Sequence, residues 1–220
     1  MKTMIFPTLK GKIYGYVNLN SEARSWLIQH GSNKNPLLNP AVCQEMVAAV
    51  HKKYGLDFSY GGWLEDRSVL WKGSYLEEKK KFIHLGIDIN VPVGTDVATD
   101  FDAEVVSVDC DYPDEGGWGT TVILKSAVIP VYIIYAHLAQ KVSCKNGDSI
   151  KKGTIFAQVG APPFNGNWFP PLHVQTMSPE YYAELDASNN WSELDGYGKA
   201  EDIERLARMF KDPLEFISLK

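Results

Sequence analysis

Residues 84–90, HLGIDIN, are the stretch of sequence that best predicts the fold and chemistry of this chain. Alternate side chains of a strand share a face, so His84 and Asp88 point the same way. The residues of the opposite face are all aliphatic, as expected of a core-facing set: Leu85, Ile87 and Ile89. Gly86 lies between the two polar residues and leaves space for another group to approach. The pattern predicts a strand that carries a histidine and a carboxylate beside a glycine notch.

A second short stretch, PLHVQ at residues 171–175, adds a third donor. His173 together with His84 and Asp88 gives two imidazoles and one carboxylate, a set that suits catalytic zinc with an open fourth position. A histidine and an aspartate four residues apart are also common as a plain hydrogen-bonded pair. The spacing by itself therefore leaves both interpretations open.

The sequence around these residues resembles the lysostaphin and LytM class of zinc metallopeptidases, which cut peptide bonds in bacterial cell-wall peptidoglycan. Five stretches carry the resemblance, in the family's order: HLGIDINVPVGTDVATDFDAEVVSV (84–108), GGWGTTVILK (116–125), VYIIYAHLA (131–139), NGDSIKKGTIFAQVG (146–160) and PPLHVQ (170–175). Because five segments match in order, the resemblance is specific to this family.

Carried over position by position, the resemblance implies that His84, Asp88 and His173 bind zinc. It also implies that His137, in YAHL at 135–138, is a catalytic histidine that does not bind the metal. The protein is then expected to be a zinc-dependent metalloendopeptidase that acts on a peptide or a peptidoglycan-like substrate.

One position departs from the family pattern. The family has a second catalytic histidine two residues before its last ligand, where this chain has Pro171. Proline has no side-chain donor, acceptor or titratable group, so it cannot take over proton transfer. The departure implies reduced activity. It also leaves an alternative open, in which the chain is an impaired homologue that keeps zinc and binds a peptide or glycan as a recognition or regulatory module.

Three aromatic residues are candidates for substrate contact. Trp168 and Phe169 precede the strand of His173 and are expected either to grip a peptide or sugar or to fill core space. Tyr135 stands two residues before His137 and is expected to line the same groove. The remaining histidines, His30 and His51, fall near predicted helix C-termini, where histidine is favoured for structural reasons.

The spacing of turn-forming residues along the sequence predicts a mainly β fold, α+β overall. Its core is expected to be an antiparallel sheet of the barrel-sandwich hybrid type with helical N- and C-terminal additions, because short strands between 82 and 177 alternate with glycine-containing turns. We expect three parts: a mixed segment over 1–80 that covers the groove, the peptidase-like domain over 81–178, and a helical extension over 179–220. Predicted helices begin at Asn20-Ser21, Asn39-Pro40 and Ser178-Pro179, and a fourth runs over 200–210.

Composition narrows the possible functions. The chain has 220 residues, of which 45% are hydrophobic and 22% charged, and its net charge is −5. Without a basic stripe, nucleic acid is not an expected partner. No run of eighteen apolar residues occurs, so no membrane span is expected.

Cysteine usage and the first residues suggest a compartment. The three cysteines, Cys43, Cys110 and Cys144, have no paired spacing and are expected to be free thiols in a reducing compartment, with a Cys110–Cys144 bridge as the less favoured alternative. The N-terminus has no secretory pattern, so a cytoplasmic location is expected. The alternative is an exported protein whose signal is absent from this sequence, since members of the family mostly act outside the cytoplasm.

Overall fold

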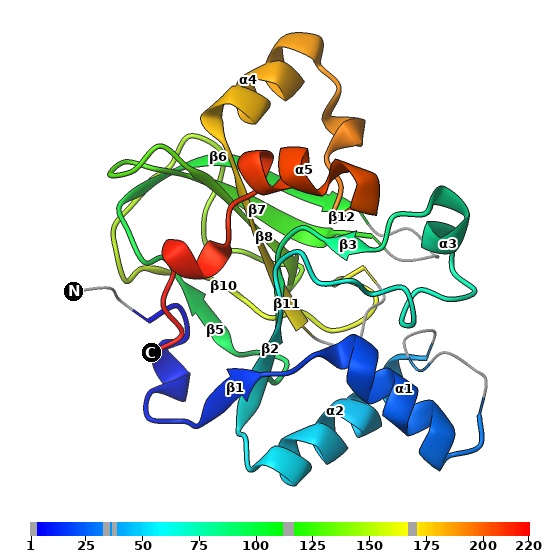
Figure 1. The fold of residues 1–220 in the computed structure, drawn as a ribbon. Helices are drawn as coiled ribbons and strands as arrows, with labels where there is room; N and C mark the ends of the chain where they lie inside the picture. Colours follow the sequence, from blue (N-terminus) through cyan, green and yellow to red (C-terminus); the bar gives the residue numbers. More distant parts are fainter. Residues whose placement is uncertain (1–3, 33–35, 37–38, 112–116, 167–170) are drawn as a thin grey trace.

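The computed structural model describes residues 4–32, 36, 39–111, 117–166 and 171–220 (Figure 1). Its centre is one eight-stranded sheet with the strand order β1-β2-β4-β11-β8-β7-β6-β9. All described neighbours in this sheet are antiparallel except the parallel pair β1–β2. The strands are Tyr14–Tyr16 (β1), Phe58–Gly61 (β2), Ile87–Asn90 (β4), Ala103–Asp111 (β6), Gly119–Ser126 (β7), Tyr132–Leu138 (β8), Ser149–Ile150 (β9) and Pro171–Met177 (β11). The predicted mainly β fold with helical additions is confirmed.

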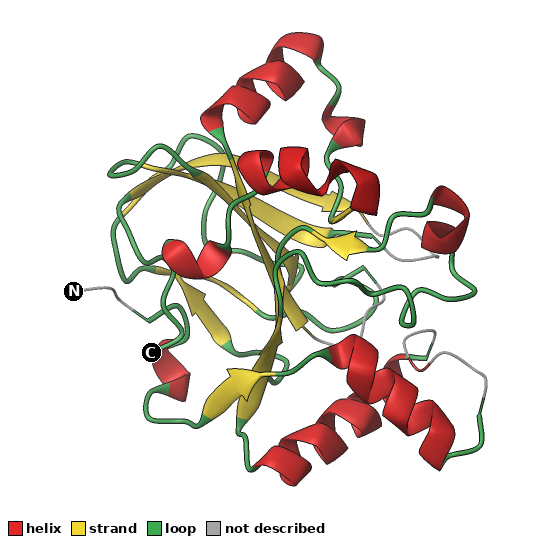
Figure 2. Ribbon diagram, viewed as in Figure 1, coloured by secondary structure: helices red, strands yellow, loops and turns green. Residues whose placement is uncertain are grey.

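Two small sheets and a set of helices surround this centre (Figure 2). The small sheets pair Asp96–Ala98 (β5) with Ile155–Gln158 (β10), and Ile83–His84 (β3) with Tyr197–Gly198 (β12). The α-helices are Leu19–Gln29 (α1), Pro40–Tyr54 (α2), Tyr75–Lys79 (α3), Pro179–Ser188 (α4) and Ile203–Met209 (α5). Single 3-10 turns occupy Pro7–Leu9 (η1), Trp191–Glu193 (η3), Ala200–Asp202 (η4) and Pro213–Glu215 (η5).

Apolar side chains cover both faces of the central strands. One face of β7 and β8 carries Val122 and Ile133 into the main core. The other face carries Ile123 and Ile134 into a second cluster that includes Phe210 of the C-terminal extension. Since both faces are covered, apolar residues follow one another without alternation at 122–124 of β7 and 132–136 of β8. In Figure 1, α4 and α5 lie on the side of β6, β7 and β8 away from β1 and β2.

The N-terminal region is built into the central sheet. Strand β2 pairs with β4, and β1 pairs in turn with β2. Ile5 and Phe6 are fully buried in the main core. The described part of residues 4–61 therefore supplies the edge strand β1, its neighbour β2 and core side chains in addition to the helices α1 and α2.

Local capping explains where the helices begin. Asn39 caps α2 and Ser178 caps α4, as predicted. The cap of α1 is Asn18, whose side chain accepts a hydrogen bond from Ser21. Asn20, the predicted start, instead accepts hydrogen bonds from the backbone of residues 69 and 70. Among the described residues, no helix is both long and apolar enough to cross a membrane.

Candidate metal centre

Three polar side chains from separate segments converge at the centre of the sheet. The Nε2 of His84 lies 3.1 Å from the Nδ1 of His173, which is 3.0 Å from Oδ1 of Asp88. The Oδ2 of Asp88 is 3.4 Å from the same His84 nitrogen. One potential ligand atom from each residue falls within 4.8 Å of the other two. The three residues singled out from the sequence are therefore neighbours in space, and their exposed fractions are 0% for His84, 8% for Asp88 and 4% for His173.

The backbone around Gly86 explains how the first two residues meet the third. The predicted continuous strand is broken: β3 ends at His84 and β4 begins at Ile87. Leu85 consequently packs against the C-terminal extension, whereas Ile87 packs in the main core, so the predicted single core-facing set is wrong in this respect. A Cβ on Gly86 would lie 2.8 Å from Nε2 of His173. The glycine notch is therefore filled by the third candidate ligand.

The hydrogen bond made by Nδ1 of His84 fixes the tautomer of this imidazole. Its Nδ1 lies 3.1 Å from the backbone carbonyl of Gly62, which can only accept, so Nδ1 carries the hydrogen and donates it. Burial lowers the pKa of His84 to about 4, and the charge of Arg67 acts in the same direction. The imidazole is therefore neutral at pH 7, and its Nε2 lone pair faces the other two side chains.

Gln175 has the same role for His173. The amide nitrogen of Gln175 donates to the carbonyl of Asp195 over 3.2 Å, which turns its oxygen towards Nε2 of His173 at 3.1 Å. The hydrogen of His173 is thus held on Nε2, and Nδ1 is the atom left to bind. Gln175 shares a strand face with His173, so a signal for it was present in the sequence.

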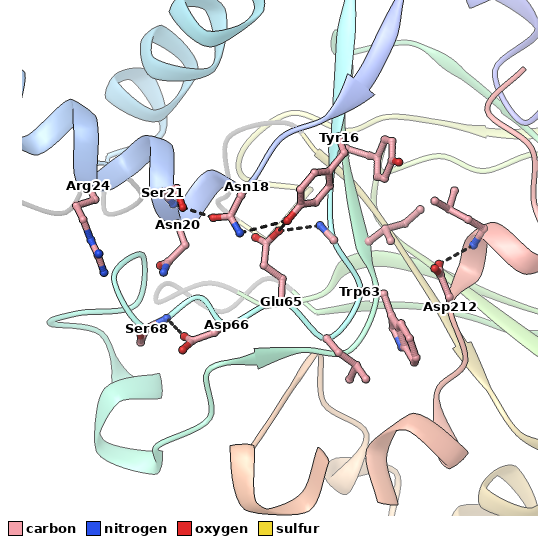
Figure 3. Close-up of a pocket in the computed structure, with 15 residues that line it drawn as sticks. Tyr16, Asn18, Asn20, Ser21, Arg24, Trp63, Glu65, Asp66, Ser68 and Asp212 are labelled. Carbon is pink, nitrogen blue, oxygen red and sulfur yellow. Dashed lines mark hydrogen bonds between the residues drawn. The ribbon is translucent and has the colours of Figure 1, made fainter. Parts of the chain in front are cut away.

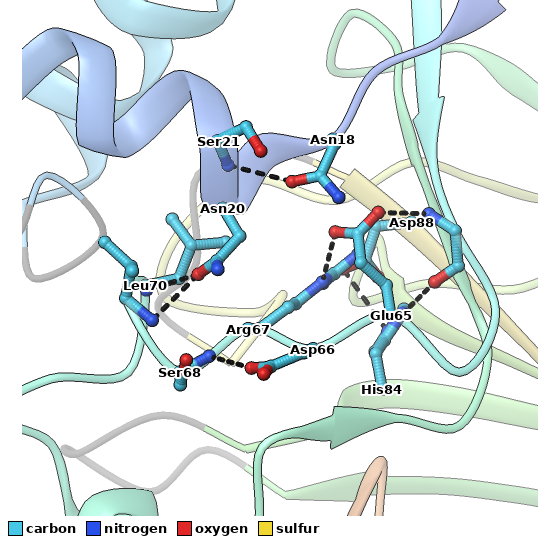
Figure 4. A network of polar contacts seen from close by, with 12 residues as sticks. Asn18, Asn20, Ser21, Glu65, Asp66, Arg67, Ser68, Leu70, His84 and Asp88 are labelled. Carbon is cyan, nitrogen blue, oxygen red and sulfur yellow. Dashed lines mark hydrogen bonds and ion pairs between the residues drawn. The ribbon is translucent and has the colours of Figure 1, made fainter.

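A buried arginine holds the carboxylate. Arg67, only 2% exposed, donates from its η1 nitrogen to Oδ2 of Asp88 (Figure 4). The same nitrogen donates to the hydroxyl of Tyr197 at 3.1 Å. Its ε nitrogen lies 3.3 Å from the buried carboxylate of Glu65. Burial alone would raise the pKa of Asp88, but His84 and Arg67 hold it well below its usual range. Nothing in the local sequence pattern indicated this arginine, because the contact depends on how the backbone of residues 64–67 pairs with residues 82–84.

A bulge turns His137 towards the centre. Ala136 is in register with His173, so simple alternation would turn the next side chain away. The ladder between β7 and β8 shifts register between Thr120 and Val122, and His137 has a φ of +63°. A bulge of this kind redirects a side chain. The His137 ring accordingly lies 6.0 Å from the His173 ring, without being one of the three convergent groups.

Tyr135 does not line this site, and its predicted role is wrong. It is in register with Val174 on the core face of β8 and is fully buried. Its ring packs edge-to-face on Phe156 at 5.1 Å. The prediction assumed regular alternation up to His137, which the bulge interrupts.

The remaining predicted positions are placed as follows. Trp168 and Phe169 lie outside the described residues. Pro171 begins β11 in register with Asn90 and is buried. His30 and His51 are in the helical N-terminal region: His30 stacks on a tryptophan, and Nε2 of His51 lies 2.8 Å from a buried serine hydroxyl. Cys43, Cys110 and Cys144 are free thiols, as expected.

Two segments enclose the convergent residues. Residues 62–67, which precede the site in the sequence, contact it through the carbonyl of Gly62 and the guanidinium of Arg67. From the C-terminal side, the carbonyl of Gly196 accepts from the backbone of Leu85 over 2.9 Å, and the Tyr197 ring lies 5.2 Å from that of His84. A polar cavity of about 600 Å³ lies beside residues 62–68, next to Tyr16 and Arg24, and no candidate ligand lines it (Figure 3).

The arrangement fits a divalent transition metal. Two neutral imidazoles present lone pairs and one ionised carboxylate presents charge to the same small space. These groups repel one another unless a cation lies between them. Nitrogen and carboxylate donors in this number suit zinc and leave a further coordination position open.

Comparison with known proteins agrees with the resemblance inferred from the motifs. Residues 82–185, just under half of the chain, match the model described as Peptidase family M23, and this supports a peptidase fold for the region. No curated protein sequence matches the chain.

Several solved structures are similar to part of the chain. They include lysostaphin (26% identity, TM-score 0.38, 44% of this chain and 38% of that one) and a zinc-containing peptidase from Vibrio cholerae (26%, 0.37, 44% and 28%). A third is a mutant catalytic domain of the prophage-encoded M23 protein EnpA from Enterococcus faecalis (27%, 0.37, 44% and 69%). This chain therefore spans well under half of the first two proteins.

Proposed function

We propose that this protein is a zinc-dependent metalloendopeptidase that hydrolyses peptide bonds, with peptidoglycan-type peptides as the substrate class. The single observation that carries the proposal is the convergence of His84, Asp88 and His173 within 4.8 Å, with both imidazole tautomers fixed from outside. The match of residues 82–185 to Peptidase family M23 supports the same reaction class.

The chain's own residues would divide the work as follows. His84 Nε2, His173 Nδ1 and a carboxylate oxygen of Asp88 would hold zinc, which when bound acidifies water and polarises a carbonyl. Arg67 and Gln175 would keep these ligands oriented, Arg67 by donating to Oδ2 of Asp88 and Gln175 by accepting the hydrogen of Nε2 of His173.

His137 is proposed to handle protons beside the zinc. Burial lowers its pKa to about 4, and His173 acts in the same direction, so it is neutral at pH 7. A neutral imidazole can accept a proton from water and return it to the leaving amine. It would act without a second imidazole, because Pro171 offers no such group at the start of β11.

Pro171 favours one alternative function. In it, the protein keeps zinc and binds peptide or glycan without efficient turnover, as a recognition or regulatory module. The alternative and the main proposal share the metal, so metal content alone cannot separate them.

Two measurements test the proposal in sequence. The first is zinc content after dialysis, where we expect about one ion per chain, loss of the ion in His173→Ala, and no loss in the exposed control His30→Ala. The second is hydrolysis of fluorescence-quenched glycine-rich peptides and of muropeptides, inhibited by a chelator and restored by zinc. His137→Ala should slow hydrolysis by about a hundred- to ten-thousandfold.

Pro171→His decides between the two functions. If the natural chain cuts these peptides and Pro171→His only raises the rate, the enzyme proposal holds. If zinc is bound but nothing is cut until Pro171→His is introduced, the natural protein is the impaired homologue. If His84→Ala and His173→Ala bind as much zinc as the natural chain, the site itself is wrong.

A further inference from the structure

A cavity of about 710 Å³ lies between the sheet and the C-terminal extension. Its floor is the face of β6, β7 and β8 that is turned away from the main core, represented by Thr121 and Ile134. Its opposite wall comes from α4 and η3, represented by Tyr182 and Trp191. The cavity thus exists only because residues 179–194 fold back over this face of the sheet, as α4 does in Figure 1.

This cavity adjoins the candidate metal centre. Trp118 lines the cavity, and its ring packs edge-to-face against the ring of His173 at 5.4 Å. A Cβ added to Gly196 would lie 3.8 Å from both of these rings. A ligand in the cavity would therefore share a wall with a candidate zinc ligand.

The described residues that line the cavity carry negative charges only. Asp109 and Asp111 at the end of β6 and Asp186 on α4 line it, whereas no lysine, arginine or histidine does so among the described residues. Within the same part of the chain, none of the three carboxylates forms an ion pair. Burial raises the pKa of Asp111, whose Oδ1 accepts the backbone hydrogen of Gly119 at 2.8 Å. All three are exposed residues, and since no cationic residue shares the described lining with them, they give the cavity a negative potential that attracts a cation.

Aromatic rings complete the lining. Trp118, Tyr182 and Trp191 contribute ring surface, and the last two pack edge-to-face at 5.4 Å, which holds both in place. Tryptophan and tyrosine faces attract ammonium and guanidinium groups through their π electrons, and they also pack on the methylene stem of a long side chain. Carboxylates and rings around one cavity therefore favour a long cationic side chain over a neutral sugar or an acidic group.

The geometry points to this cavity as the binding site for a cationic side chain of a peptide ligand, held beside the metal centre by Asp109, Asp111 and Asp186. The inference rests on the proposed peptidase function for its meaning as a specificity site. As a binding site it stands independently, because the cavity and its charges contain no candidate metal ligand.

The test is peptide binding to zinc-free protein, followed by tryptophan fluorescence and calorimetry. The probes are three capped pentapeptides, Gly-Gly-X-Gly-Gly, with X as lysine, Nε-acetyl-lysine or glutamate. We expect saturable binding of the lysine peptide and binding at least about tenfold weaker once acetylation removes the charge. Asp186→Asn and Asp109→Asn keep the side-chain shape and should each weaken binding about three- to tenfold.

A matched control and a second assay keep the inference falsifiable. Glu184→Gln removes one exposed charge from the same helix without touching the cavity, and it should leave binding unchanged. Equal binding of the lysine and acetyl-lysine peptides, or equal effects of Asp186→Asn and Glu184→Gln, would overturn the inference, as would preferential binding of a chito-oligosaccharide at the same residues. Selective binding without hydrolysis by zinc-loaded protein would overturn only the proposed function. Hydrolysis of all three peptides at equal rates would overturn the role of the cavity as a specificity site, whereas the binding site itself is overturned only by the binding results above.

Discussion

Gly86→Ala is the substitution that most directly tests how the candidate metal centre is built. An alanine Cβ at this position would lie 2.4 Å from the carbonyl oxygen of Val174 and 2.8 Å from Nε2 of His173. The first distance is 1.0 Å inside the 3.4 Å at which ordinary van der Waals contact begins. Strand β11 cannot easily withdraw, because it is hydrogen-bonded to β4 on one side and to β8 on the other.

The expected effect has two parts. Overpacking of this kind lowers the free energy of unfolding by about 1–3 kcal/mol. Alanine restricts the unfolded chain more than glycine does, which raises the free energy of unfolding by a few tenths to about 1 kcal/mol and offsets part of that loss. The second part concerns the metal. Because the new methyl group presses on the ring of His173, Nδ1 shifts from the position shared with His84, and zinc affinity should fall at least about tenfold.

Gly196→Ala is a matched control for Gly86→Ala. A Cβ at Gly196 would lie 3.8 Å from Cε1 of the same His173 ring, in ordinary contact. Urea unfolding of the metal-free proteins and zinc titration against a chromophoric chelator should therefore separate Gly86→Ala from Gly196→Ala. If the two variants unfold at the same urea concentration and bind zinc equally tightly, the glycine notch does not position His173.

Three further predictions follow from buried charges and hydroxyls. His84 and His137 have pKa values of about 4 in the folded protein, below the 6.5 of free histidine. The unfolded chain therefore binds these protons first, and the metal-free protein should lose about 2 kcal/mol of stability per histidine as the pH falls from 7 to 5. Urea unfolding at pH 7 and at pH 5 checks this, and an unchanged urea midpoint contradicts it. Arg67→Met leaves buried carboxylates without their partner and should cost about 3–5 kcal/mol, whereas Lys151→Met, at an exposed ion pair, should cost less than about 1 kcal/mol in the same assay. Tyr135→Phe removes a buried hydroxyl that has no partner in the described part of the chain, so it should keep or raise the thermal midpoint; a large loss would show that the hydroxyl is bonded.

Local patterns explain why much of the fold could be predicted. The strands β6, β7, β8 and β11 follow from short runs of apolar residues between glycine-containing turns, and the caps at Asn39 and Ser178 follow from side chains that accept backbone hydrogens. Each of these signals lies within a few residues of the element that it specifies. The stretch from Tyr54 to Tyr75, rich in Gly, Trp and Tyr, has no clear period and predicts only ordered loop with short strands, so the bounds of strand β2 and the start of helix α3 could not be predicted from it.

The sequence by itself identified the candidate ligands His84, Asp88 and His173, because the short motifs that contain them resemble the family's pattern position by position. Only the tertiary structure decided what surrounds them. The bulge that turns His137 inwards depends on the pairing of β8 with β7. The contact from Arg67 to Asp88 depends on the backbone pairing of residues 64–67 with residues 82–84. The alternation of side chains along a strand describes one segment of the chain at a time. Register shifts and long-range ion pairs arise where segments distant in the sequence pack together, and the alternation within each segment does not specify that packing.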